Sequence, residues 1–246
     1  VQAEGLRYGV EHWRRNRGRC MGTIYWQLND CWPVASWSGI DYFGRWKALH
    51  YFAKRFFSPI LASACEEDRE VSVYVTNDTR ELCRAKLCWI LYNDDITVMG
   101  SEKSIEIESF SAYEYLKLDF RNIIDTDEKK RCYYLEFSLV SDNEVISTGT
   151  VLFTPPKYYE FGPPKLKAEI EEAKDKFIIS ITSESFAKNV ELDLKSLDGV
   201  FSDNYFDLTP NHSKTVEIKK ADLSKPVCLE DIKKELFLRS LIDSYS

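Results

Sequence analysis

Apolar and polar side chains alternate over most of residues 71–139, and this period of two constrains the fold more than any other feature of the chain. Turn-forming residues stand at Asn93-Asp94-Asp95 and at Asp142-Asn143, where strands would reverse. The alternating apolar positions are Val71, Val73 and Val75, then Ala85, Leu87, Trp89 and Leu91, then Ile105 and Ile107, then Tyr133, Leu135, Phe137 and Leu139. Strands of this length and spacing predict an immunoglobulin-like β-sandwich.

A second series of strands follows a proline-rich break. Pro155-Pro156 and Gly162-Pro163-Pro164 interrupt the pattern, because proline cannot continue a hydrogen-bonded strand. Apolar strand segments then recur at 177–181, 190–194, 215–218 and 236–241. We therefore expect two immunoglobulin-like β-sandwiches, over residues 58–156 and residues 157–246.

The first 57 residues differ from the rest in composition. They hold nine Lys and Arg against four Asp and Glu, whereas the remaining residues hold 24 against 36. Five of the six tryptophans also lie there, and only Trp89 lies beyond them. The change in composition places a domain boundary near Ser58-Pro59.

This first segment has the pattern helix, strand, helix. Helical spacing of Leu6, Val10 and Trp13 predicts a helix that Gly18 ends, and residues 46–57 predict a second helix that stops before Pro59. Between them, residues 20–28 form an almost uncharged run typical of a strand buried on both faces. Such a strand belongs to a parallel sheet or barrel, so we expect residues 1–57 to be the end of a larger domain. The fold class is therefore mainly β, with an α-β-α segment before the two sandwiches.

Charge, hydropathy and cysteine content exclude several classes of partner. A net charge of −7 disfavours nucleic acid, and no apolar run approaches the roughly 20 residues of a membrane span. The first 19 residues hold five arginines and no apolar core of a signal peptide. Seven cysteines without paired spacing favour a reducing compartment, so we expect a cytoplasmic location. Two glycosylation sequons, at Asn77 and Asn211, point weakly the other way.

Searches for known catalytic and cofactor motifs find none. The histidines His12, His50 and His212 have no partner at metal-binding spacing, and the sequence contains no Cys-x-x-Cys, no Gly-x-Ser-x-Gly and no phosphate-binding glycine loop. We expect no metal and no cofactor. His12 and His50 are interpreted as helix-surface or packing residues and His212 as a loop residue, while Glu4 and Glu11 are interpreted as solvated helix positions.

One stretch, residues 25–33 with its continuation to Trp37, combines tryptophans with amide and carboxylate groups. Indole faces stack on the C–H faces of sugars, and amides and carboxylates bind hydroxyls, so this composition suits a carbohydrate site. The alternative is a hydrophobic strand end in which the tryptophans pack as a plug and Asn29 and Asp30 cap a turn. The residues alone leave both interpretations open.

The longer motif around this stretch resembles the β-mannosidase branch of glycoside hydrolase family 2. The resemblance lies in Cys20-Met21-Gly22-Thr23-Ile24-Tyr25-Trp26-Gln27-Leu28-Asn29-Asp30-Cys31-Trp32-Pro33, in residues 36–38 and in residues 41–51. Residues 199–208 and 239–241 resemble the last sandwich domain of the same family. Residues 58–154 match by position and period more than by motif.

The resemblance implies a (β/α)8 catalytic barrel, of which residues 1–57 would be the seventh helix, eighth strand and eighth helix. Family chemistry is retaining and uses two glutamates about 5 Å apart. Both come from earlier barrel strands, so no catalytic residue is assigned here and we expect the chain alone to be inactive. The implied partners are a β-mannoside oligosaccharide and the remaining N-terminal domains of a parent exo-β-mannosidase.

The resemblance also suggests which residues contact substrate. Trp26 corresponds to the tryptophan that forms the floor of the −1 sugar subsite and is commonly followed by a cis peptide bond. Asn29, Asp30 and Trp32 are expected to contact sugar or form the subsite wall, and Arg45 and Trp46 to brace the loop. Asp30 as a general acid is a weaker alternative, because it has no second carboxylate as partner.

A different class of function remains open. The two sandwiches would then be a non-catalytic module that buttresses a glycosidase barrel or binds glycan. Other enzymes of the family are disfavoured, because their eighth-strand motifs differ from Trp-Gln-Leu-Asn-Asp-Cys-Trp-Pro.

Overall fold

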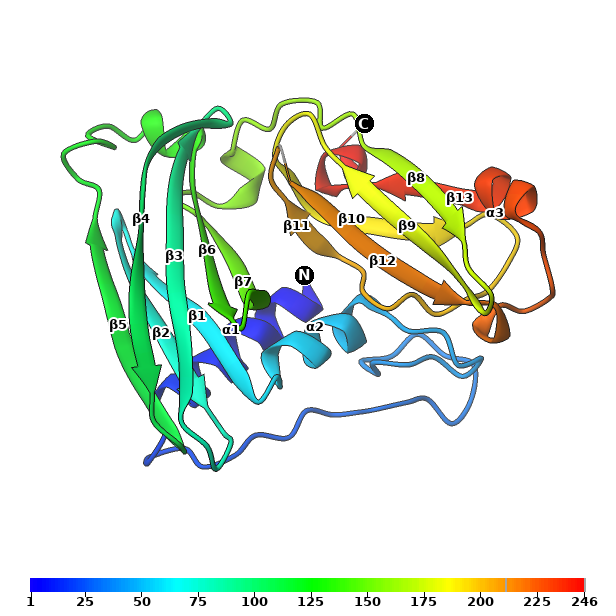
Figure 1. Ribbon diagram of the computed structural model, residues 1–246, viewed down its shortest axis with the longest axis horizontal. Helices are drawn as coiled ribbons and strands as arrows, with labels where there is room; N and C mark the ends of the chain where they lie inside the picture. The colour runs from blue at the N-terminus through cyan, green and yellow to red at the C-terminus, as the bar shows by residue number, and fades with distance from the viewer. Residues whose placement is uncertain (211, 246) are drawn as a thin grey trace. The chain divides into compact units, whose positions relative to one another are not determined.

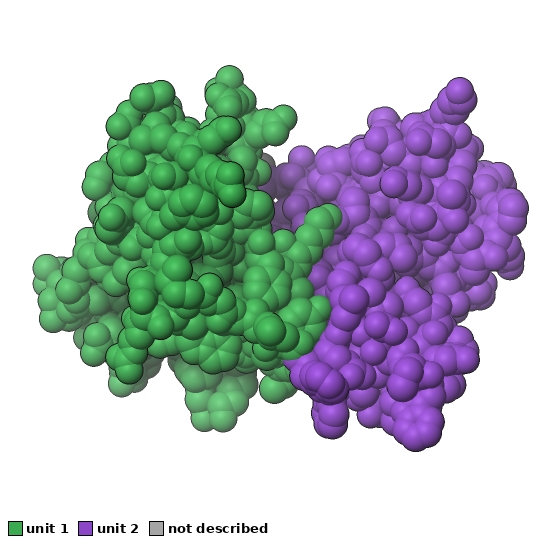
Figure 2. Space-filling model, turned by 90° about the horizontal axis from the view of Figure 1, so that it is seen from below, with its two compact units in different colours: residues 1–25, 53–160 green, residues 26–52, 161–246 purple. Residues whose placement is uncertain are grey.

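The computed structural model describes residues 1–210 and 212–245, and the chain divides into two compact units (Figures 1 and 2). Unit 1 consists of residues 1–25 and 53–160, and unit 2 of residues 26–52 and 161–246. The segment 1–57 is therefore shared between the two units, each of which contains one β-sandwich. The mainly β class predicted from the sequence is confirmed.

Unit 1 contains a sandwich of two antiparallel sheets, with strand orders β1-β2-β5 and β4-β3-β6-β7 (Figure 1). Helix α1 precedes this sandwich, the short helix η1 lies between β5 and β6, and the short helix η2 follows β7. The elements are α1 (Gln2–Arg15), β1 (Ile60–Glu67), β2 (Glu70–Asn77), β3 (Cys83–Asn93), β4 (Ile96–Ile107), β5 (Ser111–Asp119), η1 (Lys129–Arg131), β6 (Tyr133–Ser141), β7 (Glu144–Leu152) and η2 (Pro156–Tyr158).

The core of unit 1 consists of the alternating residues identified in the sequence. Val71, Val73 and Val75 of β2 are fully buried and share one hydrophobic core with Leu87 and Leu91 of β3. The predicted turns are also present: Asp94 and Asp95, like Asp142 and Asn143, have positive φ angles and connect β3 to β4 and β6 to β7. Asp and Asn tolerate the left-handed conformation that such tight hairpins need.

Unit 2 contains the second sandwich, with strand orders β12-β9-β8 and β11-β10-β13. Phe177, Ile179 and Ile181 of one sheet pack in the same core as Val190 and Leu192 of the other.

The last predicted strand of unit 2 is shorter than expected, because residues 241–244 form a 3-10 helix. The elements are β8 (Lys167–Glu172), β9 (Lys176–Thr182), β10 (Ala187–Leu194), β11 (Phe206–Leu208), β12 (Ser213–Lys219), η3 (Lys220–Asp222), α3 (Leu229–Glu235), β13 (Leu236–Arg239) and η4 (Leu241–Ser244). Helix α2 (Ala48–Phe56) spans the boundary between the units in sequence.

Both predicted N-terminal helices form, but the buried face of α1 differs from the prediction. Its buried residues are Ala3, Val10 and Glu11, whereas the side chain of Trp13 is 43% exposed. Glu11 was interpreted as solvated, and this was wrong. Arg7 Nη1 lies 3.2 Å from its carboxylate, and Arg15 Nη1 lies 4.0 Å away, so two arginines one turn before and after it compensate the buried charge.

Arginines also fasten α1 to the sandwich of unit 1. Arg14 donates to the backbone oxygen of Phe56 at 2.6 Å and to Asp78 at 3.0 Å, and Arg15 donates to the backbone oxygen of Ala64 at 3.1 Å. Arg17 forms a further ion pair with Asp78. The positive charge that the sequence concentrates in this segment therefore binds a carbonyl group at the end of the second N-terminal helix, and a carbonyl group and a carboxylate of the neighbouring sandwich.

The strand predicted at residues 20–28 does not form. Within the part of the chain that the structure describes, no strand pairs with this segment, and the nearest bridge joins Asn29 to Ile40. A strand needs hydrogen-bonded neighbours, which explains why apolar sequence alone does not produce one here. Ile24 is 96% exposed, and Met21 and Leu28 are also exposed.

The sequon at Asn77 is not accessible in this fold. Asn77 is fully buried, and its Nδ2 donates to the backbone oxygens of Glu81 at 2.8 Å and Ile107 at 3.3 Å. Its Oδ1 accepts from the backbone of Thr79 at 2.8 Å. The second sequon, at Asn211, lies outside the described residues.

All seven cysteines are free thiols. The described helices include none with the length and apolar character of a membrane span.

Candidate functional site

The tryptophan-rich segment belongs to unit 2 and folds into a loop closed by backbone hydrogen bonds. Ile40 donates to the oxygen of Leu28 at 2.8 Å, Asp30 donates to the oxygen of Ile40 at 3.1 Å, and Lys47 donates to the oxygen of Gly39 at 2.9 Å. These bonds join three short stretches, around residues 29, 40 and 46, through a parallel and an antiparallel bridge. The segment between them, residues 31–38, projects as the loop that carries Trp32 and Trp37.

Asp30 fastens the base of this loop. Its carboxylate is buried and accepts from Ser36 Oγ at 2.5 Å, Ser38 Oγ at 2.7 Å and Lys47 Nζ at 3.3 Å. Lys47 Nζ also donates to Ser38 Oγ at 2.7 Å. The hydroxyls of Ser36 and Ser38, followed by Lys47, lower the pKa of Asp30 because they stabilise its charged form. A carboxylate held ionised in this way is a poor general acid.

The tryptophans around this base are open to solvent. Trp26 is 71% exposed, Trp32 67% and Trp37 59%, so they do not pack as a hydrophobic plug. The Trp26–Gln27 peptide bond is cis, as the family resemblance leads us to expect. Asn29 is also exposed, and its Nδ2 donates to the backbone oxygen of Asp30 at 3.2 Å.

The loop encloses a shallow hollow of about 210 Å³. Its lining is formed by Gln27, Asp30, Cys31, Trp32, Val34, Ala35, Ser36 and Trp37. Of the residues predicted to contact sugar, Asp30 and Trp32 therefore line one concave surface, whereas Trp26 and Asn29 do not line it. The arrangement offers indole faces and amide groups, which are the groups that bind sugars.

A tight turn braces the far end of the loop. Asp41 Oδ1 accepts from the backbone nitrogens of Phe43 and Arg45 at 2.9 Å each, and Arg45 Nε donates to Asp41 Oδ2 at 2.7 Å. Gly44 has a φ of 85°, a value that side chains disfavour. Trp46 packs against His50 with ring centroids 4.3 Å apart. Arg45 therefore braces this turn, and Trp46 packs on the first turn of α2.

No acid pair of a glycosidase occurs at this loop. Glu4 and Glu11, the only glutamates among residues 1–57, lie on α1 in ion pairs with Arg7. Burial raises the pKa of Glu11, but its carboxylate faces arginines rather than a cavity of the loop. Among the residues that the structure describes, no three His, Cys, Asp or Glu side chains are grouped to hold a metal ion.

The roles of Ser36, Ser38 and Lys47 were not predicted from the sequence. The family motif predicted Asp30 as a sugar contact. The two serines belong to the same motif, but no role was predicted for them. The alternation of Ser36 and Ser38 on one side of a turn is the signal that could have indicated a shared partner. Lys47 carries no local signal, because its partner lies 17 residues earlier.

Comparisons with known proteins agree with the fold of both sandwiches. Residues 69–158 match the model of the mannosidase Ig/CBM-like domain, and residues 161–244 match the Ig-fold domain of mannosidases. The class is therefore a pair of mannosidase-type immunoglobulin domains.

Whole-chain relatives narrow this class further. The β-mannosidase of Capra hircus is 30% identical over 265 aligned residues, which cover 100% of this chain and 29% of that protein. β-Mannosidase A of Emericella nidulans is 30% identical over an alignment that covers 100% of this chain and 28% of that protein. The crystal structure of β-D-mannosidase from Dictyoglomus thermophilum matches with a TM-score of 0.84 and 26% identity, over 97% of this chain and 28% of that one. An exo-chitosanase of Amycolatopsis orientalis, with a TM-score of 0.69 and 17% identity over 97% of this chain and 32% of that one, shares the fold.

The chain belongs to the β-mannosidase branch of glycoside hydrolase family 2 and carries its C-terminal region. It spans about 29% of the length of the curated relatives it matches.

Proposed function

We propose that this chain is the C-terminal part of a retaining exo-β-mannosidase that removes terminal β-D-mannose, and that its tryptophan loop forms one wall of the sugar subsite. The observation that carries the proposal is the exposed indole of Trp26, held beside a loop whose base is fastened by Asp30. Trp26, Asn29 and Trp32 are the proposed sugar contacts. Asp30 forms part of the subsite wall. It holds the loop in place by accepting hydrogen bonds from Ser36 and Ser38.

The chain by itself is proposed to be inactive. Retaining hydrolysis needs a nucleophile and an acid/base about 5 Å apart. Asp30 is saturated with hydrogen bonds that keep it ionised, and Glu11 is enclosed by Arg7 and Arg15. The two catalytic glutamates are expected on the part of the parent enzyme that precedes this chain.

Two measurements test this proposal. The purified 246-residue chain should not hydrolyse p-nitrophenyl β-D-mannoside, and turnover that follows the chain through purification would contradict the proposed inactivity. In the full-length protein that carries this segment, Trp26→Ala should lower kcat/KM by about 10- to 100-fold, because a misplaced sugar ring loses its alignment with the catalytic groups. Trp13→Ala, which removes a half-exposed tryptophan of α1, is the matched control and should leave kcat/KM within about twofold.

A non-catalytic buttress is the second candidate, and one observation favours it. Each half of the segment 1–57 forms a compact unit with one sandwich: residues 1–25 with the first and residues 26–52 with the second. In this case the sandwiches hold pieces of the barrel in place and bind no sugar. An unchanged kcat/KM in Trp26→Ala, together with a lowered melting temperature of the full-length protein, would favour the buttress.

A further inference from the structure

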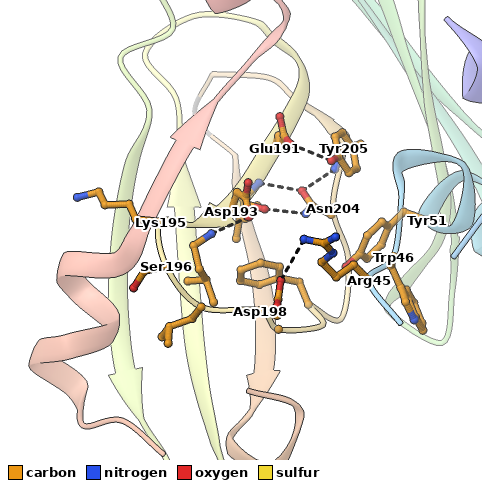
Figure 3. Close-up of a pocket in the computed structure, with 15 residues that line it drawn as sticks. Arg45, Trp46, Tyr51, Glu191, Asp193, Lys195, Ser196, Asp198, Asn204 and Tyr205 are labelled. Carbon is orange, nitrogen blue, oxygen red and sulfur yellow. Dashed lines mark hydrogen bonds and ion pairs between the residues drawn. The ribbon is translucent and has the colours of Figure 1, made fainter. Parts of the chain in front are cut away.

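Unit 2 contains a second cavity, of about 360 Å³, which shares no lining residue with the hollow of the tryptophan loop. It lies between the segment 45–51 on one side and strand β10 with the connection 195–205 on the other (Figure 3). Small-molecule sites begin at about 300 Å³, so a monosaccharide is a suitable size for this cavity. A role for this cavity goes beyond the proposed function, in which only the tryptophan-rich loop contacts sugar.

Aromatic rings from both sides of the cavity lie close together. Tyr51 is buried between two half-buried rings, with its centroid 5.9 Å from that of Tyr205 and 5.3 Å from that of Trp46. In Figure 3 Trp46 and Tyr51 extend from the segment 45–51, and Tyr205 extends from the connection 195–205. A partly exposed ring backed by a buried one is a rigid surface for stacking the C–H face of a sugar.

The wall behind these rings is fixed by hydrogen bonds. Asn204 Nδ2 donates to the backbone oxygen of Leu192 at 2.8 Å, and its Oδ1 accepts from the backbone nitrogens of Leu192 at 2.8 Å and Tyr205 at 2.9 Å. Tyr205 Oη donates to Glu191 at 2.8 Å, and Glu191 also accepts from Arg239 Nη2 at 2.8 Å. The position of the Tyr205 ring is therefore set before any ligand binds.

Charged side chains of both signs also line the cavity. Asp193 and Asp198 contribute exposed carboxylates, and Arg45, from the segment 45–51, contributes a guanidinium group. Arg45 Nη1 lies 3.7 Å from Asp198 Oδ1, and both side chains are more than half exposed, so this ion pair is weak and opens at little cost. With both signs of charge at one surface, an anion is repelled by the carboxylates and a cation by the guanidinium group. They suit a neutral ligand whose hydroxyls both donate and accept hydrogen bonds.

We propose that this cavity is a second carbohydrate site, which holds one neutral pyranose with its ring against Tyr205 and its hydroxyls on Asp193 and Asp198. The carboxylates accept hydrogen bonds from neighbouring hydroxyls, and Arg45 donates to a ring or hydroxyl oxygen. The role proposed for this site is to bind a sugar and not to cleave it.

The test is a titration of the 246-residue chain with methyl β-D-mannoside, followed by amide chemical shifts in ¹H–¹⁵N spectra. We expect saturable shifts at residues 193–198 and dissociation in the millimolar range, as is usual for a single small ligand at a partly open site. The double variant Asp193→Asn/Asp198→Asn should bind about tenfold more weakly, because it loses two charged acceptors. Asp222→Asn, the same change at an exposed acid of unit 2 outside the cavity, should bind as the unaltered chain does.

Trp32→Ala separates this site from the tryptophan loop. Loss of binding in Trp32→Ala with full binding in the double variant would place the sugar at the loop and overturn the second site, while leaving the proposed subsite intact. Absence of saturable shifts at residues 193–198 in the unaltered chain would overturn it directly, whether or not the variants fold. Shifts there that persist unchanged in the double variant would also contradict the roles of Asp193 and Asp198.

Discussion

Lys47 Nζ lies 3.3 Å from Oδ2 of Asp30, a carboxylate that is only 4% exposed although it sits at the base of an exposed loop. Two serine hydroxyls complete its hydrogen bonding. A small polar cluster, rather than a hydrophobic core, therefore holds the base of this loop. The order of the loop should depend on that cluster.

Ser38→Ala should loosen the loop. The Ser38 hydroxyl is fully buried and bonds both Asp30 and Lys47, so its removal should lower the free energy of unfolding of unit 2 by about 1–2 kcal/mol. Faster proteolysis within residues 31–38 should accompany this change. Ser101→Ala, at an exposed position of β4, is the control and should change stability by less than about 0.5 kcal/mol. Equal effects of the two substitutions would contradict the role of the cluster.

The Asp30 cluster should also make stability depend on pH below 4. The folded state lowers the pKa of Asp30 from its usual value of 3.8, so the unfolded chain binds its proton more tightly. The stabilising contribution is therefore present above about pH 4 and is lost as the pH falls through the lowered pKa. Melting temperatures of Asp30→Asn and the unaltered chain should differ most at neutral pH and converge in acid. Asp222→Asn should follow the unaltered chain at every pH, and a constant gap for Asp30→Asn would contradict the prediction.

Glu11→Ala should destabilise unit 1. The substitution leaves Arg7 and Arg15 without the buried carboxylate between them, and we expect a loss of about 3 kcal/mol in the free energy of unfolding. Glu4→Ala removes a partly exposed ion pair with the same Arg7 and should cost less than about 1 kcal/mol. Urea unfolding of both variants measures the difference. Similar losses for the two would mean that burial of Glu11 has no energetic weight.

Two glycines in unit 1 should respond oppositely to alanine. A Cβ at Gly149 in β7 would collide with Cζ of the buried Phe137, so Gly149→Ala should cost about 1–3 kcal/mol of folding free energy. A Cβ at Gly5 in α1 meets nothing within 4 Å, so Gly5→Ala should stabilise by up to about 1 kcal/mol. Thermal unfolding by circular dichroism distinguishes the two. Stabilisation by Gly149→Ala would show that Phe137 can move aside.

Exposed apolar residues at 21–28 should promote self-association. Ile24 and Met21 present apolar surface of the kind that soluble domains normally bury. Replacing both with serine should lower the fraction of oligomers in sedimentation velocity, while Val145→Ser, an exposed apolar residue of β7, serves as the control. An unchanged fraction of oligomers in the double variant would mean that this segment does not drive association.

The alternation in the strands was sufficient to predict both sandwiches. Because side chains of a strand point alternately to its two faces, Val71, Val73 and Val75 could be assigned to a core without knowledge of the partner sheet. Turn residues such as Asp142 and Asn143 were equally local signals, since their preference for positive φ depends on the residue itself. Helix α2 followed from the spacing of its apolar residues for the same reason.

Long-range pairing decided the rest. Residues 20–28 have the composition of a buried strand, yet composition cannot supply neighbouring strands, and no strand forms over this segment. Glu11 has the pattern of a surface residue and becomes buried because α1 turns that face, with two arginines, toward other parts of unit 1.

The sequence by itself determined the sandwiches and the family motif of the tryptophan loop, because both depend on residue type and short spacing. Only the tertiary structure showed that Asp30 is buried by Ser36, Ser38 and Lys47, and that Tyr51 lies beside Tyr205 154 residues later, with ring centroids 5.9 Å apart. Contacts between distant residues arise from how the elements pack, and no local pattern of one sequence records that packing.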